Sequence, residues 1–326
     1  MKVATIGSGM IVDWFLHAAA QNDGVEAVAM YSRRKESAAP LAEKYQIQKI
    51  YTDLDEMLAD KEIDTVYVAS PNSLHFPQTK QAMLAGKHVI CEKPFTSTLA
   101  EAKELKQLAL QHQVYLFEAI VTAHMPNYLE LKKHIEDLGT IRMVQCNFSQ
   151  YSSKYNALLA GETPNVFNTK FSGGALADIN IYNLHFVAGL FGMPEDIHYF
   201  PNKHENGIDT SGVAILTYPG FQAVCVGCKD TKSKCMAQIQ GEKGYIIVES
   251  ETSRCANVTL YKDGNATSFT SEQNPDSLFY EVMEFNRIIN ANDFESCMKK
   301  LDYSLMVMDI YEKARKNGGI LFEADK

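Results

Sequence analysis

Short apolar runs alternate with amphipathic stretches along the first part of the chain. The apolar runs occupy residues 2–6, 25–31, 64–70, 87–91 and 114–119, and helical patterns begin at about Met10, Lys35, Ser73 and Thr98. Short strands that are apolar on both faces are typical of a parallel sheet covered by helices. The pattern therefore predicts an α/β domain built on a doubly wound parallel sheet.

A different pattern follows Glu118. One long amphipathic segment extends to about Leu138, and alternating apolar and polar positions then occupy residues 141–151, 212–218, 221–228, 234–240 and 244–250. This period of two predicts an antiparallel sheet with one covered face. Helical spacing returns at residues 277–291 and 301–317. Because no low-complexity linker intervenes, we expect two domains that meet near Val121, residues 1–121 and 122–326.

Composition narrows the class of partner. Of the 326 residues, 46% are hydrophobic and 22% are charged, with no apolar run long enough to cross a bilayer and no apolar leader after Met1. These features predict a cytosolic (cytoplasmic) globular protein. The net charge of -9 argues against a nucleic acid or an anionic membrane as partner. Small molecules and other copies of this chain are the partners that remain.

The seven cysteines are scattered and odd in number, so we expect reduced thiols. Cys225 and Cys228 form a C-x-x-C pair, the spacing of many zinc and redox sites. On a strand, however, this spacing sends the two side chains to opposite faces. No second pair completes a ligand set, and no metal site is predicted.

A glycine loop follows the first predicted strand and precedes a helix. Gly7 and Gly9 permit a tight turn and a close approach of the backbone to a pyrophosphate, which would lie against the helix N-terminus at Met10 and Ile11. Val12 stands where the third glycine of G-x-G-x-x-G is expected. The alternative is a tight turn that binds no ligand.

The second predicted strand ends without the acidic residue that usually holds the ribose 2'-hydroxyl of NAD. Ser32, Arg33 and Arg34 follow it instead, and these side chains suit a 2'-phosphate. The sequence therefore favours NADP, with NAD as a possible cofactor. The alternative is a solvated basic loop before the next helix.

Two further loops follow buried strands, and ligands of open parallel sheets bind beyond the carboxyl ends of the strands. The predicted cofactor contacts in these loops are Ser70, Pro71, Asn72, His75, Glu92 and Lys93. Lys93 is expected near the nicotinamide, although most lysines are solvated surface residues.

These segments resemble the glucose-fructose oxidoreductase, inositol dehydrogenase and rhizopine catabolism (Gfo/Idh/MocA) family over nearly the whole chain. The motifs that carry the resemblance are the glycine loop, SPNSLH, CEKP, YLFEA, FNTKFSGGALADINIY, GEKGYIIVE and FYEVMEFNRII. The resemblance implies a Rossmann domain followed by an α/β domain with a large open sheet. It also implies homodimers or homotetramers and NAD(P)-dependent oxidation of a sugar, polyol or related diol.

The segment after Gly174 is predicted to open a helix. Asp178, Tyr182 and His185 are spaced at i, i+4 and i+7, so they are expected on one helical face. Inositol dehydrogenase-like members carry a histidine where this chain has Tyr182. With a tyrosine at this position, the chain is more similar to the branch of glucose-fructose oxidoreductase and dihydrodiol dehydrogenase. For His185 we favour a packing role.

Hydride transfer from a carbinol carbon requires removal of the hydroxyl proton. A phenol can take this proton if a nearby cation lowers its pKa. We therefore assign Tyr182 as the acid/base, Lys93 as its electrostatic partner and substrate anchor, and Asp178 as the group that orients the substrate hydroxyl or the lysine. Lys93 as the proton carrier itself is the rival assignment.

The chain departs from the family pattern at several positions. Ala123 and His124 occupy the region where many members have an arginine, and Asn180 replaces a more usual glycine. Lys154 and Tyr155 lie in a stretch that is expected to vary with the substrate. A non-catalytic dinucleotide-binding regulator or sensor is the alternative function, because fold alone does not decide activity.

Overall fold

The computed structural model describes residues 1–326, which form two compact units. The first unit comprises Met1–Ala119 and Asn274–Leu305, and the second comprises Ile120–Gln273 and Met306–Lys326. This division differs from the expected contiguous one, because residues 274–305 join the first unit. Aromatic packing explains the difference, since Phe285 stacks on Phe117 with ring centroids 4.5 Å apart.

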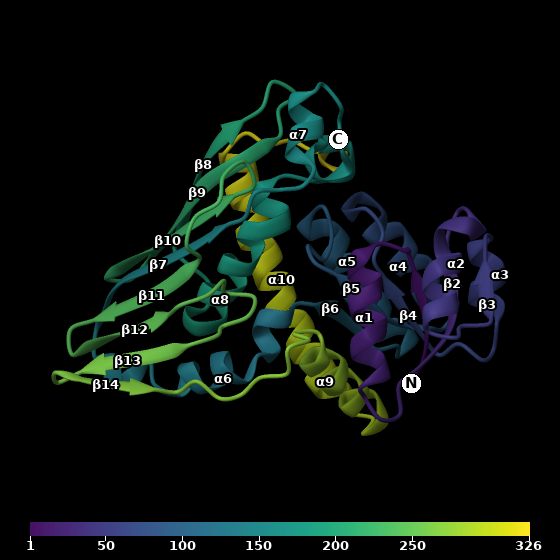
Figure 1. The fold of residues 1–326 in the computed structure, drawn as a ribbon, viewed down its shortest axis with the longest axis horizontal. Coiled ribbons are helices and arrows are strands. Elements are labelled where there is room, and N and C mark those ends of the chain that lie inside the picture. Colours follow the sequence, from purple (N-terminus) through teal and green to yellow (C-terminus); the bar gives the residue numbers. More distant parts are fainter. The chain divides into compact units, whose positions relative to one another are not determined.

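The first unit contains a six-stranded parallel sheet in the order β3-β2-β1-β4-β5-β6 (Figure 1). Its strands are β1 (Lys2–Ile6), β2 (Glu26–Tyr31), β3 (Lys49–Tyr51), β4 (Thr65–Val68), β5 (His88–Glu92) and β6 (Leu116–Ala119). Its helices are α1 (Met10–Ala20), α2 (Lys35–Lys44), α3 (Leu54–Ala59), α4 (His75–Leu84), α5 (Leu99–His112), α9 (Phe279–Asn290) and the first part of α10 (Phe294–Asn317). The predicted doubly wound sheet is confirmed. The strand β3 and the helix α3 were not predicted, because a strand of three half-buried residues leaves almost no apolar run.

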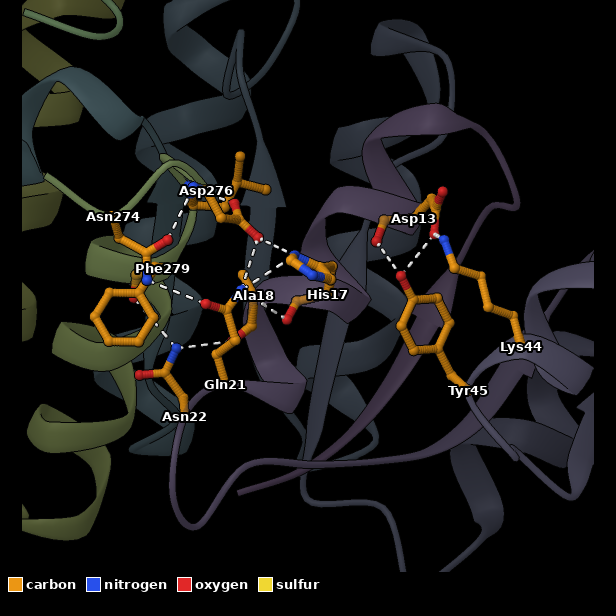
Figure 2. A network of polar contacts seen from close by, with 11 residues as sticks. Asp13, His17, Ala18, Gln21, Asn22, Lys44, Tyr45, Asn274, Asp276 and Phe279 are labelled. Carbon is orange, nitrogen blue, oxygen red and sulfur yellow. Dashed lines mark hydrogen bonds and ion pairs between the residues drawn. The ribbon is translucent and has the colours of Figure 1, made fainter. Parts of the chain in front are cut away.

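Polar contacts hold the first and the last turn of helix α1, as Figure 2 shows. On one side the Tyr45 hydroxyl donates to Asp13 Oδ1 at 2.6 Å, and the Lys44 ammonium pairs with the same carboxylate at 2.6 Å. On the other side His17 Nδ1 lies 2.8 Å from Asp276 Oδ2 in the segment that leads into α9. These contacts fix the helix that begins at the glycine loop.

The second unit contains an eight-stranded sheet in the order β14-β13-β12-β11-β7-β10-β9-β8 (Figure 1). Its strands are β7 (Ile141–Ser149), β8 (Asp196–Lys203), β9 (Asp209–Tyr218), β10 (Phe221–Cys228), β11 (Met236–Gly241), β12 (Gly244–Val248), β13 (Val258–Lys262) and β14 (Asn265–Ser268). Only the pair β7 and β10 is parallel. The predicted, mostly antiparallel sheet is confirmed.

The helices of the second unit differ from the sequence pattern at the start of this unit. They are α6 (Pro126–Lys133), α7 (Tyr155–Leu159), α8 (Ile181–Phe191) and the second part of α10 (Phe294–Asn317). The prediction of one continuous amphipathic segment up to Leu138 is wrong. This part of the chain is divided into a 3-10 turn (Val121–His124), α6 and a second 3-10 turn (Glu136–Leu138). Pro126 explains the break, since proline lacks an N–H and therefore starts a new helix.

Side chains on the eight-stranded sheet alternate between a covered and an open face. On β10, Cys225 is fully buried while Cys228 is half-buried, so the two cysteines of the C-x-x-C pair point to opposite faces, as predicted. Cys225 lies in register with Cys146 of β7 on the covered face. None of the helices combines the length and the apolar character that a transmembrane span requires.

Candidate active site

The glycine loop forms a cradle at the N-terminus of α1. Gly7 has a φ of +119°, and a Cβ atom added there would lie 2.7 Å from the Ala69 carbonyl oxygen, so only glycine fits. A Cβ atom on Gly9 would meet nothing within 4 Å. Gly9 is the N-cap of α1 and offers no side-chain cap, which leaves the first backbone N–H groups of the helix, those of Met10 and Ile11, for a ligand. This arrangement fits a dinucleotide pyrophosphate.

Val12 occupies the position of the missing third glycine and is fully buried. Its Cγ2 atom would lie 3.4 Å from a Cβ atom on Gly7, which is ordinary van der Waals contact. The helix therefore packs on the loop through a valine side chain, and the cradle at Gly7 and Gly9 is kept without the full glycine motif.

Two arginines follow the carboxyl end of β2. Arg33 and Arg34 are exposed, and neither guanidinium group forms an ion pair or a hydrogen bond with another residue of the chain. Arg34 is the N-cap of α2 and provides no side-chain cap, so this helix N-terminus also favours an anion. Ser32 is half-buried, and its backbone N–H donates to the Tyr51 carbonyl at 3.1 Å. The guanidinium groups and the helix end together suit a phosphate group.

His75 joins the two loops that follow β4 and β5. Its Nδ1 atom lies 2.9 Å from the Pro94 carbonyl oxygen, and its Nε2 atom lies 2.9 Å from the Ser70 carbonyl oxygen. Burial lowers the pKa of His75, although the two carbonyl contacts act in the opposite direction. Because the ring is 1% exposed, His75 braces the loops, and a direct cofactor contact by His75 stays a prediction. Pro71 and Asn72, in the loop after β4, are half-buried at the start of a 3-10 turn.

Glu92 is the last residue of the strand β5, and Lys93 follows it. Glu92 is 7% exposed and accepts a hydrogen bond from the Tyr67 hydroxyl at 2.5 Å. Burial raises the pKa of Glu92 to about 7, against the opposing effects of the Tyr67 hydrogen bond and the Lys93 charge. Lys93 is half-buried, and its peptide bond to Pro94 is cis. The predicted cofactor lysine therefore follows directly on a carboxyl group that titrates near neutral pH.

Two further buried carboxyl groups accompany Glu92 in the first unit, and the sequence analysis missed both. Glu118, at the end of β6, accepts a hydrogen bond from the Phe95 backbone N–H at 3.2 Å. Glu281 on α9 is 1% exposed, and its pKa is raised, first by burial and then by the charges of Glu92, Asp276 and Glu118. An acidic residue at the end of an apolar strand, as at Glu118, was the available signal.

In the second unit, Asp178 lies in a π-helical segment (Leu176–Asn180) that leads into α8, where Tyr182 and His185 lie. Only Tyr182 and His185 therefore lie in the regular α-helix, and the expected common face of all three residues stays a prediction. Tyr182 is half-buried and packs on Phe148, with ring centroids 5.9 Å apart. His185 is fully buried.

Asp178 forms an ion pair with Lys229, the residue that follows β10. The Lys229 side chain is 8% exposed, whereas the Asp178 side chain is 36% exposed. The sequence analysis did not single out Lys229. Its place directly after an alternating strand, comparable to that of Lys93 after β5, was the signal that could have found it.

Asp209 holds the start of the segment that carries Asp178. Its Oδ2 atom accepts hydrogen bonds from the Leu176 backbone N–H and from the Tyr199 hydroxyl, each at 2.7 Å. Gly174 makes room for this carboxylate, because a Cβ atom there would lie 2.0 Å from Asp209 Oδ1. Burial raises the pKa of Asp209, while these hydrogen bonds lower it. Asp209 thus positions the Asp178 backbone.

Asn180, where family members more often carry glycine, is fully buried and donates to the Cys225 carbonyl at 3.0 Å. Gly227 on β10 faces it, since a Cβ atom on Gly227 would lie 2.5 Å from the Asn180 Cβ atom. The larger residue on the helix is therefore matched by a glycine on the strand. No group of three or more His, Cys, Asp or Glu side chains is assembled that could hold a metal ion.

Comparison with known proteins agrees with this architecture. Residues 1–120 match the oxidoreductase family with an NAD-binding Rossmann fold, and residues 128–247 match the GFO/IDH/MocA C-terminal domain. The chain is 38% identical over 327 residues to the scyllo-inositol 2-dehydrogenase (NADP(+)) IolU of Bacillus subtilis (strain 168), covering 100% of this chain and 99% of the relative.

A second relative is the D-xylose 1-dehydrogenase (NADP(+)) of Hypocrea jecorina, which is 28% identical and covers 84% of this chain and 78% of its own length. Among solved structures, KijD10, a 3-ketoreductase from Actinomadura kijaniata in complex with NADP, has the same fold, with a TM-score of 0.82, 20% identity and 97% coverage of both chains. From the match of both domains and the full-length identity to IolU, we conclude that this chain belongs to the Gfo/Idh/MocA family of NAD(P)-binding oxidoreductases.

Proposed function

We propose that this protein is an NADP-preferring dehydrogenase or reductase that interconverts a CH–OH group and a carbonyl group in a polyol, a sugar or a cyclic diol. The observation that carries the cofactor preference is the pair Arg33 and Arg34, exposed and without acidic partners at the carboxyl end of β2. The NADP(+) dependence named for the inositol and xylose dehydrogenases supports the same choice.

The bound nicotinamide supplies the hydride acceptor or donor of the reaction. The chain supplies the proton chemistry, with Tyr182 as the acid/base and Asp178 as the group that orients the reacting hydroxyl. Lys93 provides a positive charge that favours the ionised phenol, or carries the proton itself in the rival assignment. The buried Glu92 directly before Lys93 in the chain supports a tuned electrostatic environment for that lysine.

Turnover of a substrate panel with NADP(+) tests the proposal. The panel contains scyllo-inositol, other cyclitols, D-xylose and a vicinal cyclic diol, and reduction of the cofactor is followed by absorbance. We expect turnover of at least one member, and a loss of about 10²- to 10⁴-fold in kcat for Tyr182→Phe with unchanged NADPH binding. NADPH binding without turnover of any member would instead favour the regulator or sensor.

We further propose that copies of this chain associate through the open face of the eight-stranded sheet. The central strands present half-buried or exposed side chains there that are uncharged: Met143, Gln145, Asn147, Val213, Ile215, Thr217, Gln222, Val224, Val226, Met236, Gln238, Gln240, Tyr245, Ile247, Thr259 and Tyr261. An uncharged surface of this extent, on which apolar and aromatic side chains alternate with amide and hydroxyl groups, favours contact with another protein. A second copy is the partner we propose, as a homodimer or homotetramer.

A further inference from the structure

The ion pair of Lys229 with Asp178 has hydrogen-bonding capacity that the chain does not use. A lysine ammonium carries three N–H donors. Asp178 takes one of them, and no other residue accepts a hydrogen bond from Lys229 Nζ. A side chain only 8% exposed has little access to bulk water. Unfilled donors on a buried cation are costly, so a ligand that fills them gains affinity.

The position of Lys229 is fixed by its backbone. Its N–H donates to the Thr210 carbonyl at 2.8 Å, and its carbonyl accepts a hydrogen bond from the Ser152 N–H at 2.8 Å. These bonds continue the sheet beyond the ends of β7 and β10. The ammonium is therefore presented from a rigid sheet, which favours recognition of one ligand geometry.

The same sheet extension brings in the stretch that we expected to shape the substrate pocket. Tyr151 and Tyr155 flank Ser152 and contact each other edge to face, with ring centroids 5.7 Å apart. Tyr155 also contacts Phe167, with ring centroids 5.8 Å apart. The backbone bond between Ser152 and Lys229 connects this aromatic stretch with the strand end that carries Lys229, and small-molecule sites usually combine aromatic rings with a few fixed polar groups.

We propose that Lys229 and Asp178 together recognise two hydroxyl groups on adjacent carbons of the substrate. One hydroxyl donates to the Asp178 carboxylate, and its neighbour accepts from a remaining N–H of the Lys229 ammonium. Oxygens on adjacent carbons are separated by about the length of a hydrogen bond, as are the paired ammonium and carboxylate. Lys229 is then the residue that selects a vicinal diol over a simple alcohol. This inference rests on the proposed function and narrows its substrate class.

Competition by two matched ligands tests this role. The trans vicinal diol of cyclohexane and cyclohexanol differ by one hydroxyl, and each is titrated as a competing ligand against the panel substrate with the highest turnover. We expect wild-type protein to bind the diol more tightly than cyclohexanol. In Lys229→Met the diol should lose about 10- to 100-fold in affinity, while cyclohexanol changes by less than about threefold.

Two further variants serve as controls for the proposed role of Lys229. Lys232→Met removes an exposed lysine three positions away and should change neither ligand. Lys229→Gln keeps N–H donors without the charge and should bind the diol better than Lys229→Met does. Lys229→Gln is also the second test variant if Lys229→Met does not fold. NADPH titration of each variant confirms that the first unit is intact.

Equal losses for both ligands in Lys229→Met would assign Lys229 a purely structural role and overturn the inference. A wild-type protein that binds both ligands equally would overturn it as well. If no panel substrate is turned over although NADPH binds, the proposed function fails first, and this inference fails with it.

Discussion

The Tyr67 hydroxyl donates a 2.5 Å hydrogen bond to Glu92, the residue that directly precedes Lys93. The bond joins the neighbouring strands β4 and β5 at the carboxyl end of β5, directly before the predicted cofactor lysine. Because burial raises the pKa of Glu92 to about 7, this carboxyl group is largely protonated in the folded protein at mildly acidic pH. In an unfolded chain the same group ionises near pH 4.5.

We predict that Glu92→Gln stabilises the first unit at pH 8. The folded state binds more protons than the unfolded state between about pH 4.5 and 7, so the free energy of unfolding contributed by Glu92 falls as the pH rises through this window. Glutamine keeps an acceptor for Tyr67 but has no charge to bury. Urea unfolding should show a gain of up to about 3 kcal/mol at pH 8 and little change at pH 4.

The matched control is Glu43→Gln, which removes an exposed carboxylate of α2 and should alter stability by less than about 0.5 kcal/mol at either pH. An equal effect of Glu92→Gln at pH 4 and pH 8 would show that titration of Glu92 is not the cause.

We predict that Arg33→Ala weakens NADPH binding about tenfold or more and leaves NADH binding nearly unchanged. The lost contact is a charge-assisted hydrogen bond to the 2'-phosphate, which NADH lacks. Titration of both nucleotides, followed by nicotinamide fluorescence, measures the two affinities.

Lys103→Ala is the control, because Lys103 is an exposed cation on α5. It should lower neither affinity by more than the general loss of one positive charge. Tighter binding of NADH by the wild-type protein, or an equal loss of both nucleotides in Arg33→Ala, would contradict the NADP assignment.

We predict that Asp178→Asn lowers the free energy of unfolding by about 2 kcal/mol, because it leaves the buried Lys229 ammonium without its carboxylate. Adding Lys229→Met should recover most of that loss, since the uncompensated charge is then removed. Chemical unfolding of the two single variants and the double variant measures this coupling.

Asp309→Asn provides the comparison within the same unit. Asp309 pairs with Lys313 on the surface of α10, and its removal should cost less than about 0.5 kcal/mol. If the double variant is no more stable than Asp178→Asn alone, the cost lies elsewhere than in the unpaired lysine.

We predict that Val224→Asp prevents the proposed association of copies through the open sheet face. Val224 lies opposite Ile215 of β9 and Gln145 of β7 on the uncharged sheet face, so a carboxylate there would be desolvated in an interface with a second copy. Light scattering after size exclusion should give a multiple of the single-chain mass for the wild-type protein and the single-chain mass for the variant.

Leu84→Asp is the matched control, because Leu84 is 53% exposed on α4 of the first unit. It should leave the assembly unchanged. An unchanged mass in Val224→Asp would exclude this face as the interface.

Strong local patterns were sufficient to predict much of the fold. Continuous apolar strands between helical stretches predicted the parallel sheet, and period-two alternation predicted the antiparallel one, because each pattern reflects which faces of a strand are covered. Sequence patterns failed to predict the secondary structure where the apolar pattern was short or was interrupted. The three-residue strand β3 carries no periodicity, and Pro126 divides what the spacing alone presents as one amphipathic segment.

Local patterns predicted the residues of the proposed chemistry: a glycine loop before a helix, arginines in place of an acidic residue, Lys93 after a buried strand, and Asp178 at the opening of a helix. The partners of such residues follow from the tertiary fold. It paired Asp178 with Lys229 and bound the Asp209 carboxylate to the Leu176 N–H, contacts that join positions distant in the chain. Local sequence records propensity and burial, whereas ion pairs between strands and helices depend on how those elements pack together.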